Sequence, residues 1–312
     1  MNVTQKKERH LRPRWVDDIP LYLMALPGLL CLLIFSYLPM IGLVMAFQKL
    51  DLRKGIFTSP WVGLDNFKFL FYSTDAWVIT RNTVCYNAVF IVLNMFLAVL
   101  LALLLSELIS RKLAKTLQTI FIMPHFLSWP VVAIIAFAFL SANNGFLNKI
   151  VAFFGGPERT NWYMEVKPWP LILVVVTMWK GVGYSAIVYL AAISGISQEY
   201  YEAAMLDGAS KFQQARYITI PHLKTMMTIL LIMAIGGIFR GDFGLFYTVP
   251  RNTGTLYPVT NIIDTYVYNA MAVLSNYGMA TAAGLYQSVV GCILIIISNK
   301  IVSRIEPDNA LF

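Results

Sequence analysis

Long apolar stretches alternate with short polar segments along almost the whole chain. Because the hydrocarbon core of a membrane is about 30 Å thick, a helix needs about 20 apolar residues to cross it. An alternating barrel pattern is absent, so stretches of this length are predicted to be helices that satisfy their own backbone groups. The pattern predicts an all-α, polytopic membrane protein with six transmembrane helices, over residues 20–47, 84–105, 117–140, 170–193, 227–249 and 280–302.

The first apolar stretch follows a basic segment, as the apolar part of a secretory signal peptide does. It spans 28 residues, from 20 to 47. The apolar part of a signal peptide is about 7–15 residues long. We therefore predict a retained membrane helix, preceded by a cytoplasmic tail over residues 1–19.

The positions of Lys and Arg predict how the chain is oriented in the membrane, because cytoplasmic segments are enriched in both. With both ends in the cytoplasm, the inside segments contain twelve Lys and Arg in 73 residues, and the outside loops contain nine in 95. The density favours N-in and C-in. The exception is the first outside loop, which holds five of the nine: Lys49, Arg53, Lys54, Lys68 and Arg81.

The greater part of the same outside loop, residues 48–80, contains a short helical pattern. Leu64, Phe67, Leu70 and Phe71 recur at helical spacing after Gly63. The spacing predicts an amphipathic helix over residues 65–72. It lies either on the outer membrane surface or packed against the protein.

The composition excludes several classes of protein. Of the 312 residues, 58% are hydrophobic and 13% are charged, which excludes a disordered chain and disfavours a soluble enzyme. The net charge of +8 comes from basic residues beside apolar stretches, so it does not indicate a nucleic-acid partner. The three Cys and three His lack disulfide or metal-ligand spacing, and nucleotide-binding and acyl-hydrolase motifs are absent. We expect no catalytic residue, no metal and no cofactor bound by this chain.

A polar loop over residues 194–226 separates the fourth and fifth stretches. Helix-forming residues cover 198–206, and Gly208 in the following turn can adopt the left-handed conformation that ends a helix. Ser210 and Gln213 have the spacing of a capping box, and Pro221 is expected to interrupt the chain before the fifth helix.

This loop has a surface suited to docking. The pattern predicts that it exposes Tyr200, Tyr201, Met205 and Phe212. A short helix with exposed aromatic side chains suits a groove on another subunit.

The loop resembles the cytoplasmic EAA motif of a known family, the MetI-like permeases of binding-protein-dependent ABC importers. The resemblance covers residues 81–304, and Ile220 stands where the family usually has Leu. The matching residues, which the resemblance implies couple the permease to its ATPase, are Glu202, Ala203, Ala204, Asp207, Gly208, Ala209, Ile218, Ile220 and Pro221.

Other segments narrow the resemblance. Residues 61–71, 123–129, 178–193 and 239–252 are similar to carbohydrate permeases for polysaccharides and complex oligosaccharides. The resemblance implies a permease domain over residues 81–304, followed by a short C-terminal tail over residues 305–312. It also implies a location in the bacterial cell membrane.

The family resemblance implies a division of labour between subunits. The chain is expected to be the permease of an ATP-driven importer, moving an oligosaccharide delivered by an external solute-binding protein. ATP and Mg²⁺ belong to two copies of a separate ATPase, and a second permease completes a heterodimer in the lipid bilayer. In the loop, Glu202 is expected to pair with a basic group of the ATPase, and Asp207 to cap the following helix.

Charged residues inside the predicted spans mark a candidate substrate path. Each costs about 2.5–3.5 kcal/mol at the bilayer centre, and three occur: Lys180, Arg240 and Asp242. The glycine-rich run 236–244 is expected to break the fifth helix, as happens where backbone lines a cavity. Tyr184, Phe239, Phe243 and Tyr247 are the aromatic candidates for the same path. The alternative is that these charges form an internal ion pair or pair with the second permease.

Cationic side chains in the path would suit glycans that carry uronate groups. A non-sugar solute remains an alternative within the importer family. A stand-alone secondary transporter is a different class, but the chain shows no inverted repeat. A non-transporting scaffold is the third alternative.

Overall fold

The structure is a computed structural model that describes residues 19–305, and within this range the chain is helical, without β-strands. The predicted terminal tails lie almost entirely outside the described residues. Five helices are long and apolar enough to cross a membrane, and a sixth span is counted if one bent helix pair is taken as one. The five are Ile19–Phe47, Thr74–Ser106, Trp169–Ser194, Lys211–Gly236 and Tyr277–Arg304.

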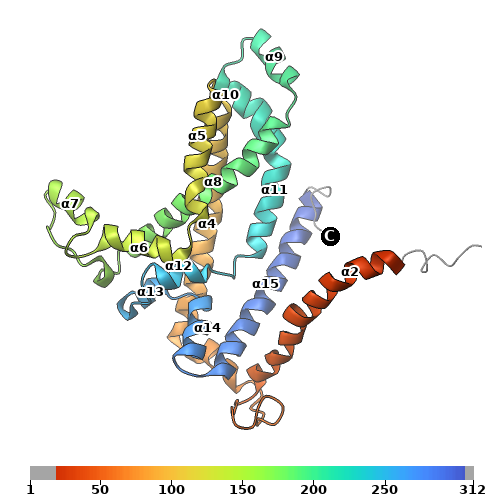
Figure 1. Ribbon diagram of the computed structural model, residues 1–312, viewed down its shortest axis with the longest axis vertical. Helices are drawn as coiled ribbons and strands as arrows, with labels where there is room; N and C mark the ends of the chain where they lie inside the picture. Colours follow the sequence, from red (N-terminus) through yellow and green to blue (C-terminus); the bar gives the residue numbers. More distant parts are fainter. Residues whose placement is uncertain (1–18, 306–312) are drawn as a thin grey trace, which may run out of the picture.

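The first of these spans changes its helical winding along its length. It consists of α2 (Ile19–Leu32), a π segment (Leu33–Tyr37) and a 3₁₀ segment (Leu38–Phe47). None of the residues of α2 is buried. Figure 1 shows α2 leaning away from the other helices, so the first span touches the rest of the chain near its far end, beside the start of α15 (Tyr277–Ile305).

The third predicted span is broken. It consists of α5 (Arg111–Ile122), a 3₁₀ turn (Met123–Phe126) and α6 (Trp129–Leu140), and the two halves are bent by 101°. The span predicted over 117–140 is therefore not one straight helix, and its two prolines are the expected cause of a kink. Pro124 lies in the 3₁₀ turn and Pro130 in the first turn of α6, and neither has a backbone N–H to continue the preceding helix.

The fifth span begins and ends earlier than residues 227–249. Helix α10 (Lys211–Gln214), a π turn (Ala215–Thr219) and α11 (Ile220–Gly236) follow one another without interruption. Pro221 therefore does not interrupt the chain. It sits in the first turn of α11, where a proline needs no N–H partner, and the wider π turn before it bonds Ile220 N–H to the Ala215 carbonyl.

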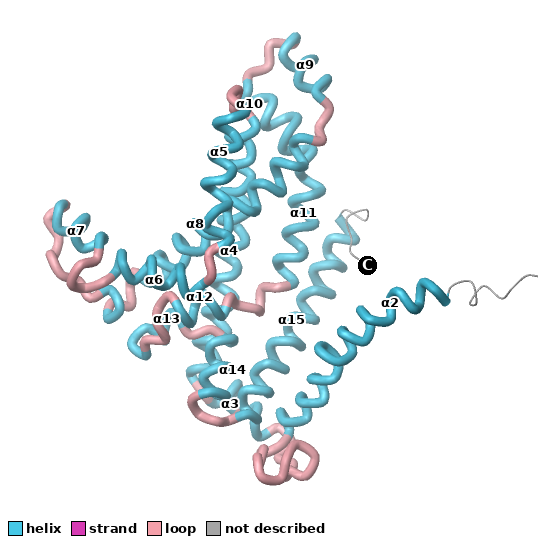
Figure 2. The backbone as a smooth tube through the Cα atoms, in the orientation of Figure 1, coloured by secondary structure: helices cyan, strands magenta, loops and turns pink. Residues whose placement is uncertain are grey.

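Beyond Gly236 the chain leaves the helix and returns through short segments. Residues 237–242 are not helical, as the glycines predicted. Figure 2 shows this loop between α11 and α12. The segments that follow are α12 (Phe243–Thr248), a 3₁₀ turn (Gly254–Leu256), α13 (Tyr257–Thr260) and α14 (Ile263–Ala272).

The outside loops also contain short helices. The predicted helix over 65–72 is present as a 3₁₀ turn (Asp65–Phe67) and α3 (Phe69–Tyr72). Asn66 Nδ2 donates to the carbonyls of Ala46 (3.0 Å) and Gln48 (2.9 Å), so the segment is held against the end of the first span. The contacts support packing on the protein. The second outside loop contains α7 (Phe146–Phe153) and a 3₁₀ turn (Trp162–Met164).

The core forms where α4 (Thr74–Ser106) crosses α8 (Trp169–Ser194). Ala98, Ala102 and Ala186 are fully buried at this crossing, together with Tyr189 and Leu223. Small side chains let two membrane helices approach closely and gain van der Waals contacts. At one end of the bundle lies α9 (Gln198–Leu206), and at the opposite end the loop that follows Phe47 (Figure 1).

Candidate functional site

The polar loop over residues 194–226, which we call the coupling loop after the role that the family resemblance implies, is built around a helix with both ends capped. Ser197 accepts a hydrogen bond from Glu199 N–H at the start of α9. At the other end Ala209 N–H donates to the Ala204 carbonyl (2.9 Å) and Gly208 N–H to the Met205 carbonyl (3.1 Å). This bond pair is a Schellman motif, which needs a left-handed residue after the cap. Gly208 supplies it with φ of +79°.

The second short helix of the loop is capped as its spacing predicted. Ser210 Oγ accepts from Gln213 N–H, and Gln213 Oε1 accepts from Ser210 N–H at 2.7 Å, which closes the capping box. The prediction that Asp207 caps this helix is wrong. Asp207 is the C-cap residue of the preceding helix α9, and Ser210 is the N-cap of α10.

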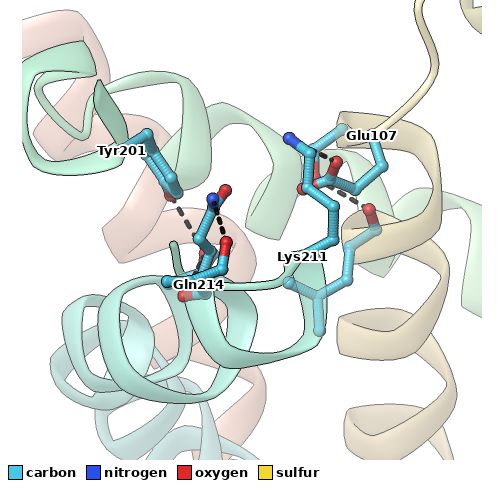
Figure 3. A network of polar contacts seen from close by, with 8 residues as sticks. Glu107, Tyr201, Lys211 and Gln214 are labelled. Atoms are coloured by element: carbon cyan, nitrogen blue, oxygen red, sulfur yellow. Dashed lines mark hydrogen bonds and ion pairs between the residues drawn. The ribbon is translucent and has the colours of Figure 1, made fainter. Parts of the chain in front are cut away.

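Polar contacts tie the coupling loop to the spans (Figure 3). Lys211 Nζ lies 3.0 Å from Glu107 Oε2, at the end of α4. Tyr201 Oη and Thr219 Oγ1 are 3.0 Å apart, which joins α9 to the π turn before α11. Gln214 is 2% exposed and donates to the Ala209 carbonyl. The ion pair is exposed on both sides and therefore weak, so the buried contacts do most to fix the loop.

Several large apolar side chains of the coupling loop are exposed. Leu206 is 91% exposed and Phe212 is 74% exposed, and Tyr200, Met205 and Tyr217 are also exposed. Tyr201, which was predicted to be exposed, is half-buried because its hydroxyl bonds to Thr219. The sequence reasoning missed Leu206. The sequence did contain a signal that Leu206 would be exposed. Glu202 and Ala203 lie one helical turn before it, and neither is a large apolar side chain against which Leu206 could pack.

The motif residues divide between the two sides of the loop. Those on the exposed side include Glu202, Ala203, Asp207, Gly208, Ile220 and Pro221, whereas Ala204, Ala209 and Ile218 are half-buried. Among the described residues, Glu202 has no ion-pair or hydrogen-bond partner for its carboxylate. Its side chain is therefore available to a second protein.

The second candidate site is the break after α11. There, side chains of neighbouring helices form hydrogen bonds with the backbone groups that the broken helix leaves unbonded. Asn87 Nδ2 donates to the carbonyls of Ile238 (2.7 Å) and Arg240 (3.0 Å). Gln287 Nε2 donates to the Phe239 carbonyl (2.6 Å), and Asp264 Oδ2 accepts from Gly241 N–H (2.7 Å). Unbonded backbone is too costly at membrane depth to persist. The sequence reasoning missed Asn87 and Asp264 in this part.

Lys180 lies at the other break, the bend between α5 and α6. Its Nζ donates to the carbonyls of Pro124 (3.4 Å), His125 (2.7 Å) and Leu127 (2.7 Å). The same ammonium lies 5.2 Å from the centre of the Trp129 ring. The three donors of Lys180 are thus used by the backbone of the bend. This geometry favours a structural part for Lys180 over direct contact with substrate.

Asp242 and Tyr184 lie around the same bend. Asp242 Oδ1 accepts from Leu245 N–H and caps α12. A Cβ on Gly244 would lie 2.0 Å from the Trp129 ring, so α12 packs closely on α6. Tyr184 stacks on His125, with ring centres 4.4 Å apart. The structure therefore brings Lys180, Asp242 and Tyr184 to one region.

Arg240 is separate from this cluster. It lines a cavity of about 580 Å³ between α11 and α15, together with Gln287. In the part of the chain that the structure describes, the guanidinium forms no hydrogen bond and no direct ion pair, but it interacts electrostatically with the Asp264 carboxylate. An ion pair between Arg240 and Asp242 is not formed.

The aromatic candidates also separate. Phe243, Tyr247 and Tyr268 form a trio with ring centres 4.9 Å apart, on α12 and α14. The sequence reasoning missed Tyr268. Phe239 is 8% exposed and packs among Ile79 and Ile263, so its side chain belongs mainly to the core.

The fold and the coupling loop indicate a family, and comparison with known proteins identifies the same family. The sequence model described as "Binding-protein-dependent transport system inner membrane component" matches residues 94–307, which is more than half of the chain. The chain belongs to this family. It is a multi-pass permease of the inner membrane and not an enzyme.

Two similar proteins align with nearly the whole length of this chain. The polygalacturonan/rhamnogalacturonan transport system permease protein YteP of Bacillus subtilis is 34% identical over 98% of this chain and 94% of its own length. Protein LplB of the same organism is 35% identical over 96% of this chain and 91% of its own length. These matches confirm the predicted family.

A solved structure has the same fold. A chain of a bacterial ABC transporter involved in the import of the acidic polysaccharide alginate matches with a TM-score of 0.86 and 32% identity, over 95% of this chain and 100% of that chain. A further structure contains the alginate transporter with a pentasaccharide-bound periplasmic protein, and its chain matches with a TM-score of 0.85. The predicted all-α permease fold is confirmed. The family assignment also points away from a stand-alone secondary transporter.

Proposed function

We propose that this permease moves an oligosaccharide bearing carboxylate groups across the membrane, as one of two permease subunits of an ATP-driven importer. The names of two similar proteins support an acidic carbohydrate, since one transports polygalacturonan and the other is part of an alginate importer. The single observation on this chain that supports it is Arg240, which lines a cavity between two spans and whose guanidinium forms no direct ion pair within the described residues.

The chemistry of arginine fits this substrate class. A guanidinium binds a carboxylate through two parallel hydrogen bonds, and it remains charged at every physiological pH. A charge at membrane depth is costly, and the electrostatic interaction with Asp264 offsets only part of this cost for Arg240 because the two groups form no direct ion pair. A uronate would give the guanidinium a directly bonded partner. The trio of Phe243, Tyr247 and Tyr268 adds aromatic faces on which sugar rings can stack.

The coupling loop is the proposed contact with the ATPase. Its exposed apolar side chains, Leu206 and Phe212 among them, dock into a cleft of the ATPase, and Glu202 pairs with a basic group there. ATP and Mg²⁺ are held by two ATPase copies, and an external binding protein delivers the glycan. The buried bonds of Tyr201 and Gln214 then transmit the movement of the docked helix to α11.

Affinity purification through a tag on this chain, in mild detergent, tests the assembly. We expect two ATPase chains for each copy of this chain and of a second permease. A chain that emerges alone and stable would contradict the docking function of the loop.

The substrate is tested on the same complex in proteoliposomes with its binding protein. We expect oligogalacturonate or oligoalginate to stimulate ATP hydrolysis, and neutral maltotriose not to do so. Stimulation by maltotriose alone, or by a non-sugar solute, would contradict the acidic substrate and leave the importer assignment standing.

A further inference from the structure

The loop after the first span lies at the outer membrane boundary. The first span ends at Phe47, and α15 begins at Tyr277 beside it. A Cβ on Gly278 would lie 2.9 Å from the Gln48 carbonyl, so the two ends pack closely. Figure 1 shows the loop at the end of the molecule opposite α9. We call residues 49–61 the outer basic loop.

The outer basic loop is a folded turn. Ser59 Oγ accepts from Asp51 N–H (3.0 Å) and donates to the Gly55 carbonyl (2.7 Å). Gly55 N–H donates to the Asp51 carbonyl, and Gly55 has φ of +79°. Ser59 is buried at the centre of these bonds. The loop therefore holds its other side chains outward in fixed positions.

Three of the outward side chains are cationic and lack protein partners. Lys49, Arg53 and Lys54 are exposed, and within the described residues their side chains form no ion pair or hydrogen bond. Two other basic residues of the same outside loop differ from them: Lys68 pairs with Asp65 at 2.9 Å, and Arg81 donates to the Pro258 carbonyl. The presence of these three cations on the outside opposes the usual distribution of charge in membrane proteins, so a reason specific to the site is needed.

The three cations surround one cavity. Its volume is about 540 Å³, within the range of ligand sites, and Ser275 and Tyr277 also line it. Asp51 is the one acidic residue that lines the cavity. One of its carboxylate oxygens accepts from Arg53 N–H within the turn. The remaining charge is positive, and its ligand is expected to be an anion.

Large apolar side chains project beside the cations. Phe57 is 83% exposed, and Leu52 and Trp61 are also exposed, as are Val273 and Leu274 of the neighbouring loop. Basic residues combined with exposed Trp, Phe and Leu are typical of segments that insert at the headgroup level of a membrane.

We propose that the outer basic loop, with Ser275 and Tyr277, binds the phosphate of an anionic lipid in the outer leaflet. Lys49, Arg53 and Lys54 contact the phosphate, and Leu52, Phe57 and Trp61 enter the acyl boundary. A phosphate group would also suit a soluble ligand, but the apolar side chains at the outer end of two spans favour a lipid. The proposal is independent of the substrate.

The test uses the complex purified through a tag on this chain, with phosphatidylglycerol titrated in detergent and bound lipid counted by native mass spectrometry. Each basic residue near an anionic surface contributes about fivefold in affinity. We expect the variant Lys49→Gln/Arg53→Gln/Lys54→Gln to bind phosphatidylglycerol about a hundredfold more weakly. The matched control, Lys149→Gln/Arg159→Gln/Lys167→Gln, removes the same charge from the second outside loop and should bind as the unchanged complex does.

Several results would overturn the proposal. Unchanged phosphatidylglycerol binding in the first variant is one. Equal binding of phosphatidylcholine would remove the role of charge, and equally strong binding of glycerol 3-phosphate would indicate a soluble ligand. A variant that keeps its lipid but loses affinity for the binding protein would make the loop a protein-docking surface.

A second measurement does not depend on that variant. Brominated phosphatidylglycerol should quench the fluorescence of Trp61, obtained as the difference between the unchanged complex and Trp61→Phe. Absence of this quenching would contradict insertion of the loop into the lipid.

Discussion

Gly208 is a position where one residue type decides the course of the chain. Its φ of +79° lies in the left-handed region, which costs most other residues about 1–2 kcal/mol. A Cβ at this position would meet nothing within 4 Å. Backbone conformation, and not lack of space, therefore requires glycine, and a substituent would project into the proposed docking surface.

This geometry predicts a difference between two substitutions of nearly equal size. Asn and Asp both tolerate the left-handed conformation, so Gly208→Asn should keep most coupled transport. Gly208→Asp adds a charge that the docked ATPase would bury unpaired, at a cost of about 2 kcal/mol or more, which is about thirtyfold in affinity. We expect uptake to fall while ATP hydrolysis continues. Uptake and hydrolysis measured in one proteoliposome preparation check this, and normal uptake in Gly208→Asp would contradict it.

Arg240 is the second residue whose chemistry makes a prediction. If its guanidinium binds a uronate, Arg240→Gln should lower uptake about tenfold or more, because a charged hydrogen bond is worth about 1.5–3 kcal/mol. Arg240→Lys keeps the charge without the two-bond geometry and should be intermediate.

Uptake of a labelled acidic oligosaccharide, with the yield of purified complex as the control, measures this effect. Intact uptake with a lowered yield of Arg240→Gln would show that Arg240 holds the bundle together.

At the scale of elements, two spans contain breaks and each break is bound by polar side chains from other helices. Asn87, Gln287 and Asp264 satisfy the backbone after α11. Lys180 satisfies the carbonyls at the 101° bend between α5 and α6. These polar residues stabilise irregular backbone that lipid alone could not tolerate.

The bend predicts that Lys180 matters mainly for stability. Lys180→Met keeps the length of the side chain but leaves its carbonyl partners unbonded, which should cost about 3 kcal/mol. We expect a lower Tm of the purified complex. Lys149→Met removes an exposed lysine from an outside loop and should leave the Tm unchanged. An unaltered Tm with lost uptake in Lys180→Met would instead assign Lys180 to the substrate path.

At the scale of the whole molecule, the coupling loop and the second outside loop lie on opposite sides of the membrane. Thiol labelling checks this in a chain whose Cys31, Cys85 and Cys292 are replaced by Ser. A membrane-impermeant maleimide should label Leu206→Cys only in inside-out vesicles and Glu158→Cys only in right-side-out vesicles.

The same experiment tests docking, because Leu206 lies at the centre of the proposed contact. The purified ATPase should protect Leu206→Cys from the maleimide and leave Glu158→Cys reactive. Labelling of both positions from one side would contradict the topology, and full reactivity of Leu206→Cys in the complex would contradict the docking.

The class of this permease, its predicted topology and the caps of its coupling loop all follow from local features of the sequence. The bilayer sets the length that an apolar stretch needs to span it and favours basic residues on the cytoplasmic side. Both requirements are the same for every span, so they can be read from the sequence. The caps of the loop are equally local, because Ser210, Gln213 and Gly208 bond within a few residues of themselves.

The positions at which the spans break, and the partners of the charged residues inside the spans, depend on the tertiary structure. A proline permits a break, but whether it bends the chain, as Pro124 does, or fits a continuous helix, as Pro221 does, depends on the turn that precedes it. Lys180 and Arg240 look alike in sequence, as single cations in apolar stretches. They differ because three carbonyls from another span surround Lys180, whereas Arg240 faces a cavity. Such partners come from distant parts of the chain, and only packing brings them together.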